Sequence, residues 1–207
     1  DPPTITAQTT PLSTPEDTAV AIALSAVTVT DPDNTFPTGF TLTVQNGASY
    51  THVGNTITPA TNFNGTLTVP VTVNDGTSNS NVFNLSVTVT PVNDAPTFTS
   101  TPITSVIEDH SYNYAITATD VDGAAPTLAA PTKPTWLTFT PGANGTATLT
   151  GTPDQAQVGT HNIVLTASDG VAPAVQQSFT ITVVAFDDAP IVTAIPDQTA
   201  TETVPFT

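Results

Sequence analysis

The side chains in this 207-residue sequence best suited to chemistry are carboxylates, and they recur in a repeated pattern. Each acidic motif of the first half has a counterpart about ninety residues later. The pairs are Glu16-Asp17 with Glu108-Asp109, Asp31-Pro-Asp33 with Asp120-Val-Asp122, and Asp75-Gly76 with Asp169-Gly170. A catalytic pair is needed only once, whereas a structural cation site can repeat. The pattern therefore favours cation binding over catalysis.

The elements that position these acids are β-strands. Thr and Val are plentiful, and both suit a pleated sheet. Segments such as 82–90 and 177–184 alternate apolar and polar residues, which is typical of half-buried strands. The predicted strands are 19–24, 40–44, 66–73, 82–90, 111–118, 147–149, 160–167 and 177–184.

The repeats predict an all-β chain of tandem seven-stranded antiparallel β-sandwiches. Val92-Asn-Asp-Ala-Pro96 recurs as Phe186-Asp-Asp-Ala-Pro190, after an alternating strand each time. We expect complete units at 1–92 and 93–185. We expect residues 186–207 to be a linker and the first strand of an incomplete third repeat, so that the chain is a piece of a longer protein.

Acids from both units should meet at the junction between them, because successive turns of a sandwich alternate between its two ends. Bare carboxylates 4 Å apart repel by about 1 kcal/mol per pair in water, and by about 4 kcal/mol at an effective dielectric of 20. A cation would offset that repulsion, and Ca²⁺ prefers roughly 6–8 oxygen ligands. The predicted ligands of this main junction site are Glu16, Asp17, Asn93, Asp94, Asp120, Asp122 and Asp169.

Two further groups of acidic residues are interpreted as halves of similar calcium sites. The partial upper site comprises Asp31, Asp33 and Asp75, and the partial lower site comprises Glu108, Asp109, Asp187 and Asp188. We expect weak or no occupancy at both, since each lacks a complete neighbouring unit. In the alternative interpretation the Asp and Asn residues of the predicted junction site merely form turns, because both residue types hydrogen-bond to nearby backbone groups.

Composition excludes several classes of partner and chemistry. Lys133 is the only basic residue against 17 acids, which gives a formal charge of −16. Such a chain has no cationic patch for nucleic acid or an anionic membrane surface. With no Cys it has no thiol catalysis, disulfide or zinc finger. No apolar run reaches the roughly 18 residues of a membrane span.

The ordered set of motifs resembles known families. The first unit is similar to the bacterial cadherin-like repeat of large surface adhesins, through Glu16-Asp-Thr18, Asp31-Pro-Asp33, Asn62-Phe-Asn-Gly65, Val73-Asn-Asp-Gly76 and Pro91-Val-Asn-Asp-Ala-Pro96. The second resembles the dystroglycan-type cadherin-like repeat, through Thr119-Asp-Val-Asp122, Pro134-Thr-Trp-Leu137, Gly151-Thr-Pro153, Val158-Gly159 and Ala167-Ser-Asp-Gly170. The resemblance implies that the tandem seven-stranded antiparallel sandwiches are Ig-like or cadherin-like, with a junction site like that of cadherins.

Together these features predict a non-catalytic, calcium-stiffened extender or stalk of a secreted bacterial surface adhesin or extracellular matrix protein. Its partners would be neighbouring repeats of the same chain. One alternative is a polysaccharide-binding or homophilic adhesion module, in which Tyr50, Tyr112 and Tyr114, at edges or on the surface, could form a platform for a glycan. We expect Trp136 to pack in the core, which would count against sugar binding by its ring. Another is a filament subunit that assembles by strand donation from residues 186–207.

Overall fold

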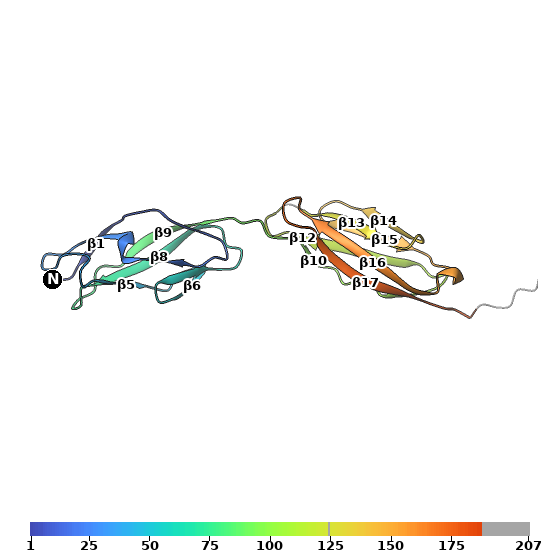
Figure 1. Cartoon of the computed structure of the whole chain (residues 1–207), viewed down its shortest axis with the longest axis horizontal. Coiled ribbons are helices and arrows are strands. Elements are labelled where there is room, and N and C mark those ends of the chain that lie inside the picture. Colours follow the sequence, from blue (N-terminus) through green and yellow to red (C-terminus); the bar gives the residue numbers. More distant parts are fainter. Residues whose placement is uncertain (124, 188–207) are drawn as a thin grey trace, which may run out of the picture. The chain divides into compact units, whose positions relative to one another are not determined.

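The computed structural model describes residues 1–123 and 125–187, which form two compact β-rich units (Figure 1). The first unit contains Asp1–Ala95 together with residues 121–123, and the second contains Pro96–Asp120 and the described residues from 125 onwards. No helix in the described ranges has the length and apolar character needed to cross a membrane. The fold class predicted from the sequence is confirmed.

The first unit contains a four-stranded sheet in the order β2-β9-β8-β5 and a three-stranded sheet in the order β3-β7-β6, while β1 pairs with β4. A short 3₁₀ turn, η1 (Leu24–Ala26), separates β3 from β4. The bounds are β1 (Thr4–Gln8), β2 (Leu12–Pro15), β3 (Val20–Ala21), β4 (Val27–Thr30), β5 (Thr41–Val44), β6 (Tyr50–Val53), β7 (Thr56–Pro59), β8 (Gly65–Asn74) and β9 (Phe83–Thr90).

The second unit contains two four-stranded sheets, in the orders β10-β12-β15-β14 and β11-β17-β16-β13. A 3₁₀ turn, η2 (Gln155–Gln157), precedes β16. The bounds are β10 (Thr97–Phe98), β11 (Ser105–Ile107), β12 (Tyr112–Thr119), β13 (Thr127–Thr132), β14 (Leu137–Pro141), β15 (Thr146–Gly151), β16 (Gly159–Ser168) and β17 (Val175–Val184).

The first strand of each unit is split between two sheets. In the first unit β1 pairs antiparallel with β4, and β2 then runs parallel to β9. In the second unit β10 pairs antiparallel with β12, and β11 runs parallel to β17. Among the described residues, the second unit has seven strands when its split first strand is counted once, and the first unit has seven when β3 and β4, which η1 separates, are also counted as one strand. The parallel pairing brings the end of β2 or β11 beside the end of the last strand.

The cores follow from the alternation of apolar and polar residues. In β8 the side chains of Leu67, Val69, Val71 and Val73 are buried, while Thr66 and Thr68 are exposed. The strongly alternating strands were therefore predicted to within two residues at their ends. The predicted strand 19–24 is shorter in the structure, because β3 ends at Ala21 and η1 interrupts the strand.

The aromatic side chains correct one sequence-based expectation and confirm another. Tyr50, Tyr112 and Tyr114 are buried rather than exposed, with relative accessibilities of 8%, 2% and 2%. Each hydroxyl has a partner, as in the bond from Tyr112 to the Ile103 carbonyl at 2.8 Å, and burial raises the pKa of Tyr112. Trp136 packs against the second core, with its ring edge-on to Tyr112.

We predict that Leu149→Ala destabilises the second unit by about 2–5 kcal/mol, because it leaves a cavity at a fully buried position of β15. The matched control is the exposed neighbour Thr148→Ala, which should change stability by less than about 0.5 kcal/mol. Urea unfolding followed by the fluorescence of Trp136 reports on this unit, since the chain has one Trp. Equal midpoints for the two variants would contradict this core assignment.

Candidate functional site

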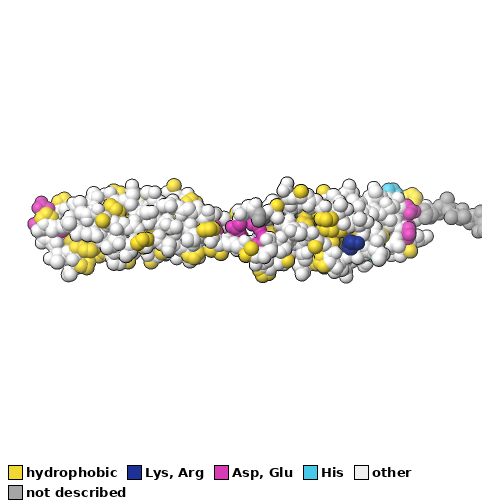
Figure 2. All heavy atoms as spheres, turned by 90° about the horizontal axis from the view of Figure 1, so that it is seen from above, with side chains coloured by type: hydrophobic (Ala, Val, Ile, Leu, Met, Phe, Trp, Pro, Cys, Tyr) yellow, Lys and Arg dark blue, Asp and Glu magenta, His cyan; other side chains and the backbone are white. Residues whose placement is uncertain are grey.

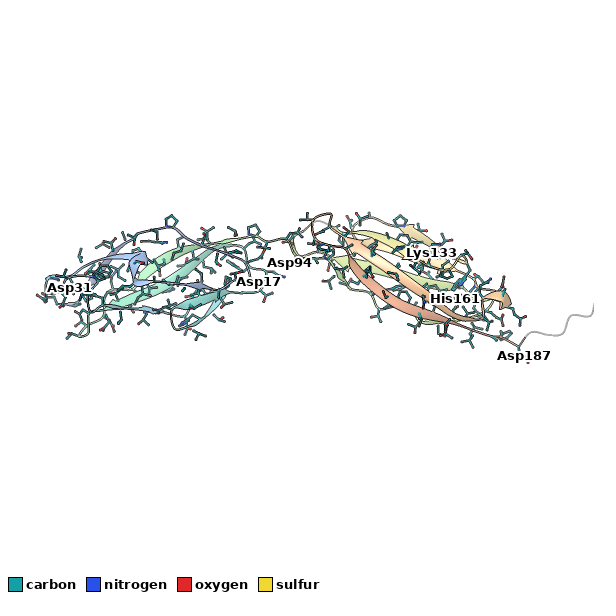
Figure 3. The ribbon with its side chains drawn as sticks, in the orientation of Figure 1. Asp17, Asp31, Asp94, Lys133, His161 and Asp187 are labelled. Atoms are coloured by element: carbon teal, nitrogen blue, oxygen red, sulfur yellow. The ribbon has the colours of Figure 1, made fainter. Side chains whose placement is uncertain are left out.

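The acidic side chains lie between the strands rather than along them. None of the described Asp or Glu residues falls within the bounds of a strand. On the face drawn in Figure 2, the acids gather at the ends of the units, and the sides of the sheets are uncharged apart from one basic residue. Within the first unit, Asp17 and Asp31 lie at opposite ends (Figure 3). The acids therefore form local groups at the ends of each unit.

Glu16 follows β2 and is almost completely buried, with 4% relative accessibility. Its N–H donates to the Thr90 carbonyl at 2.9 Å, which extends the parallel pairing of β2 with β9 by one residue. Its carboxylate Oε1 accepts the N–H of Val92 at 2.6 Å. Glu16 thus touches the chain just after it leaves the last strand of the unit.

Glu108 occupies the same place in the second unit and is fully buried. Its N–H donates to the Val184 carbonyl at 3.0 Å, and its Oε1 accepts the N–H of Phe186 at 2.5 Å. Its other oxygen, Oε2, is buried and has no hydrogen-bond partner among the described residues. A buried carboxylate is costly without compensating partners. Glu108 Oε2 is therefore a buried acceptor that a further partner could satisfy.

Asp17 and Asp109 come next in the chain and behave differently from the glutamates. Both are exposed and both adopt left-handed backbone conformations, with φ of 55° and 58°. Asp tolerates this conformation better than most residues. Asp17 Oδ1 accepts the N–H of Asn62 at 3.1 Å, and the N–H of Asp109 donates to the Pro153 carbonyl at 2.7 Å. Each Asp forms the turn that follows the buried glutamate.

The remaining predicted junction ligands are divided between the units. Within the first unit, to which residues 121–123 also belong, the N–H of Asp94 donates to Oδ2 of Asp122 at 2.6 Å. The amide of Asn93 donates to the Asp94 carbonyl at 2.8 Å. Asp120 and Asp169 belong to the second unit, where Asp169 Oδ1 accepts two backbone N–H groups of its own turn at 2.9 and 3.0 Å.

The partial upper site consists of neighbouring turns. Asp31 Oδ1 accepts the N–H groups of Asp33 and Asn34 at 2.8 and 3.0 Å, and Asp31 Oδ2 is buried without a partner among the described residues. Asp75 Oδ1 accepts two N–H groups, both at 2.7 Å, and these bonds lower the pKa of Asp75. Asp33 binds the amino group of Asp1. Oδ1 of Asp31 and Oδ1 of Asp75 thus each stabilise a turn, which is the role that the alternative interpretation gives to the aspartates of the junction site.

The partial lower site contains Glu108, Asp109 and Asp187 in the described part of the chain, and Asp188 lies outside it. Asp187 is exposed and follows the residue whose N–H Glu108 holds. The nearby Asp154 has a structural role, because it caps η2 by accepting the N–H of Ala156 at 2.8 Å.

Over residues 1–123 and 125–187, no three Asp, Glu or His side chains are grouped closely enough to hold a metal ion by themselves. All three predicted calcium sites therefore remain predictions. The predicted main junction site in particular draws on both units, so neither unit contains its whole ligand set. Each unit supplies a partial set in which some carboxylate oxygens are already hydrogen-bonded to backbone groups.

Sequence reasoning missed three side-chain amides that close strand edges in the first unit. Asn81 bonds both the N–H and the carbonyl of Ile5, at 2.8 and 3.3 Å. Gln8 bonds both backbone groups of Ser86, at 2.8 and 2.9 Å. Asn55 bridges Val44 and Leu42. No local motif marks these residues, because the first two pairings span more than seventy positions.

Comparisons with known proteins agree with this architecture. Residues 1–88 match the family model described as a bacterial Ig domain, and residues 95–184 match the one described as a putative Ig domain. Among solved structures, the protocadherin GammaB4 extracellular domain and human CDH23 EC21-23 each superpose with a TM-score of 0.52 at 17% identity. These alignments cover 90% of this chain, 32% of the protocadherin chain and 70% of the CDH23 chain.

Solved structures of lower similarity include an endo-fucoidan hydrolase from glycoside hydrolase family 107. It aligns over 89% of this chain and 29% of the hydrolase chain, at 20% identity and a TM-score of 0.39, which is too low to support an argument about activity. No curated protein sequence matches this chain. The matched residues 1–88 and 95–184 make this chain a tandem of bacterial Ig-like repeats with a cadherin-like fold.

Proposed function

We propose that this tandem is a non-catalytic extender of a secreted bacterial surface adhesin or matrix protein, and that Ca²⁺ stiffens the connection between its repeats. One observation carries the proposal. The described acids are confined to the ends of the units, and the same buried glutamate follows the first strand of both. Uncharged sheets with acidic ends suit a module that meets its neighbours end to end.

The donor set fits Ca²⁺. Every candidate ligand is a carboxylate or a side-chain amide, and oxygen atoms are what Ca²⁺ prefers. The unpartnered, buried Oε2 of Glu108 is the kind of atom that a cation would satisfy. Glu16, Asp17, Asn93, Asp94, Asp120, Asp122 and Asp169 would hold an ion at the junction. The bound ion would supply positive charge that offsets the repulsion between the acidic ends of the two units.

A catalytic role receives no support from the described residues. Each acidic motif of the first unit has a counterpart in the second, whereas a catalytic pair is needed only once. Asp31, Asp75 and Asp169 accept hydrogen bonds within their own turns. Both family matches are to Ig-type domains.

The alternative functions differ in their support. A sugar-binding platform made of tyrosines is disfavoured, because all three tyrosines are buried and their hydroxyls are engaged. Homophilic adhesion stays a proposal, as does strand donation. Strand donation would use residues 186–207, and the part of this segment from residue 188 onwards lies outside the described residues.

We predict that this chain melts at a higher temperature in Ca²⁺ than in chelator. At about 100 times its dissociation constant, an ion that binds only the folded state stabilises it by roughly 2.7 kcal/mol. Each kcal/mol corresponds to about 4–8 °C for domains of this size. Differential scanning calorimetry in Ca²⁺, in Mg²⁺ at equal ionic strength and in chelator measures the shift. Identical melting in all three solutions would contradict the proposal.

We predict that Asp120→Ala combined with Asp122→Ala removes the stiffening effect of Ca²⁺. Small-angle scattering should show that Ca²⁺ narrows the distribution of interatomic distances in the wild type but not in this variant. The matched control is Asp31→Ala with Asp33→Ala, which removes the same charge from the same Asp-x-Asp motif at the other end of the first unit. The control should respond like the wild type. An unchanged response in the Asp120 and Asp122 variant would place the ion elsewhere.

A further inference from the structure

The two buried glutamates hold the chain where it leaves each unit. Val92 lies two residues beyond the end of β9, and Phe186 lies two residues beyond the end of β17. In both units the carboxylate Oε1 accepts the N–H of that residue, at 2.6 and 2.5 Å. The partners are 76 and 78 residues apart in sequence, so the contact is a repeated product of the fold.

The hydrogen bond to the glutamate, rather than side-chain burial, fixes Val92 and Phe186 in place. The side chains of Val92 and Phe186 are 47% and 54% exposed, so burial of these side chains does little to fix this part of the chain. The glutamate side chains are 4% and 0% exposed and are fixed by the parallel strand pairing before them. A hydrogen bond from an N–H group to a carboxylate is roughly twice as strong as a neutral one.

We propose that Glu16 and Glu108 are latches that set the direction in which the chain leaves each unit, and that they do so without any cation. The neighbouring Asp17 and Asp109 are exposed turn residues and do not hold the departing chain. The latch explains why a single acid of each Glu-Asp pair is buried. It also means that removing Ca²⁺ leaves the first residues after each unit attached to it.

A second part of the inference rests on the proposed function. In Glu108, Oε1 is used by the Phe186 N–H, and Oε2 is buried with no hydrogen-bond partner among the described residues. One carboxylate can then serve two partners, with the departing backbone on Oε1 and the cation on Oε2. Binding of the ion would be coupled to the chain direction through this single side chain.

Amide hydrogen exchange on the full chain, measured by NMR in chelator, tests the latch independently of calcium. The N–H groups of Val92 and Phe186 should exchange roughly 10- to 100-fold more slowly in the wild type than in Glu16→Ala and Glu108→Ala respectively. Glu16→Gln and Glu108→Gln keep an oxygen acceptor and should retain part of the protection. Asp17→Ala and Asp109→Ala are the matched controls and should leave both N–H groups protected.

The outcomes separate the two parts of the inference. Protection of the Leu85 and Ile181 amides checks that each variant is folded, and if an alanine variant fails to fold, the wild type and the glutamine variants decide the test. Unprotected Val92 and Phe186 amides in wild-type protein would overturn the latch, whatever calcium does. A calcium titration followed by the NMR signals of Phe186 and Asp187 reads the partial lower site, where we expect weak binding in the wild type, and Glu108→Gln should bind there at least tenfold more weakly. Unchanged binding would overturn the shared carboxylate and leave the latch standing.

Discussion

The parallel pairing between the split first strand and the last strand is the constraint on which the rest of each unit depends. It joins β2 to β9 and β11 to β17, and so holds the second half of the split first strand beside the last strand of the unit. The residue after the paired segment is a buried glutamate in both units, and its backbone and side chain both bind the last strand or the chain just after it. The end of the split strand, the exit of the chain and a buried carboxylate are thus combined in one short motif.

Separation of charged and uncharged surface is the second theme of the molecule. The strands expose mainly Thr, Ser and Asn, while the described acids occupy the turns. Carboxylates grouped at the end of a unit repel one another when no cation offsets their charge. The proposed role of Ca²⁺ rests on this separation of charged ends from uncharged sheets.

Much of the fold could be predicted because its signals are local. The strands β8, β9, β16 and β17 alternate strongly, and their predicted limits agree with the structure to within two residues. The burial of the three tyrosines was not predicted, because alternation shows which residues share a face of a sheet but not which neighbouring segments cover that face. Tyr112 and Tyr114 are covered by residues near Ser100 and Ile103, in the stretch that links the two halves of the split strand.

The sequence by itself determined the strand pattern, the repeat and the restriction of acids to turns, because each depends on neighbouring residues. It also singled out the Glu-Asp pairs by their repetition. Only the tertiary structure decided that the glutamate of each pair is buried and the aspartate exposed. That distinction arises from the pairing of strands more than seventy residues apart, which fixes where each carboxylate lies and which N–H group it meets.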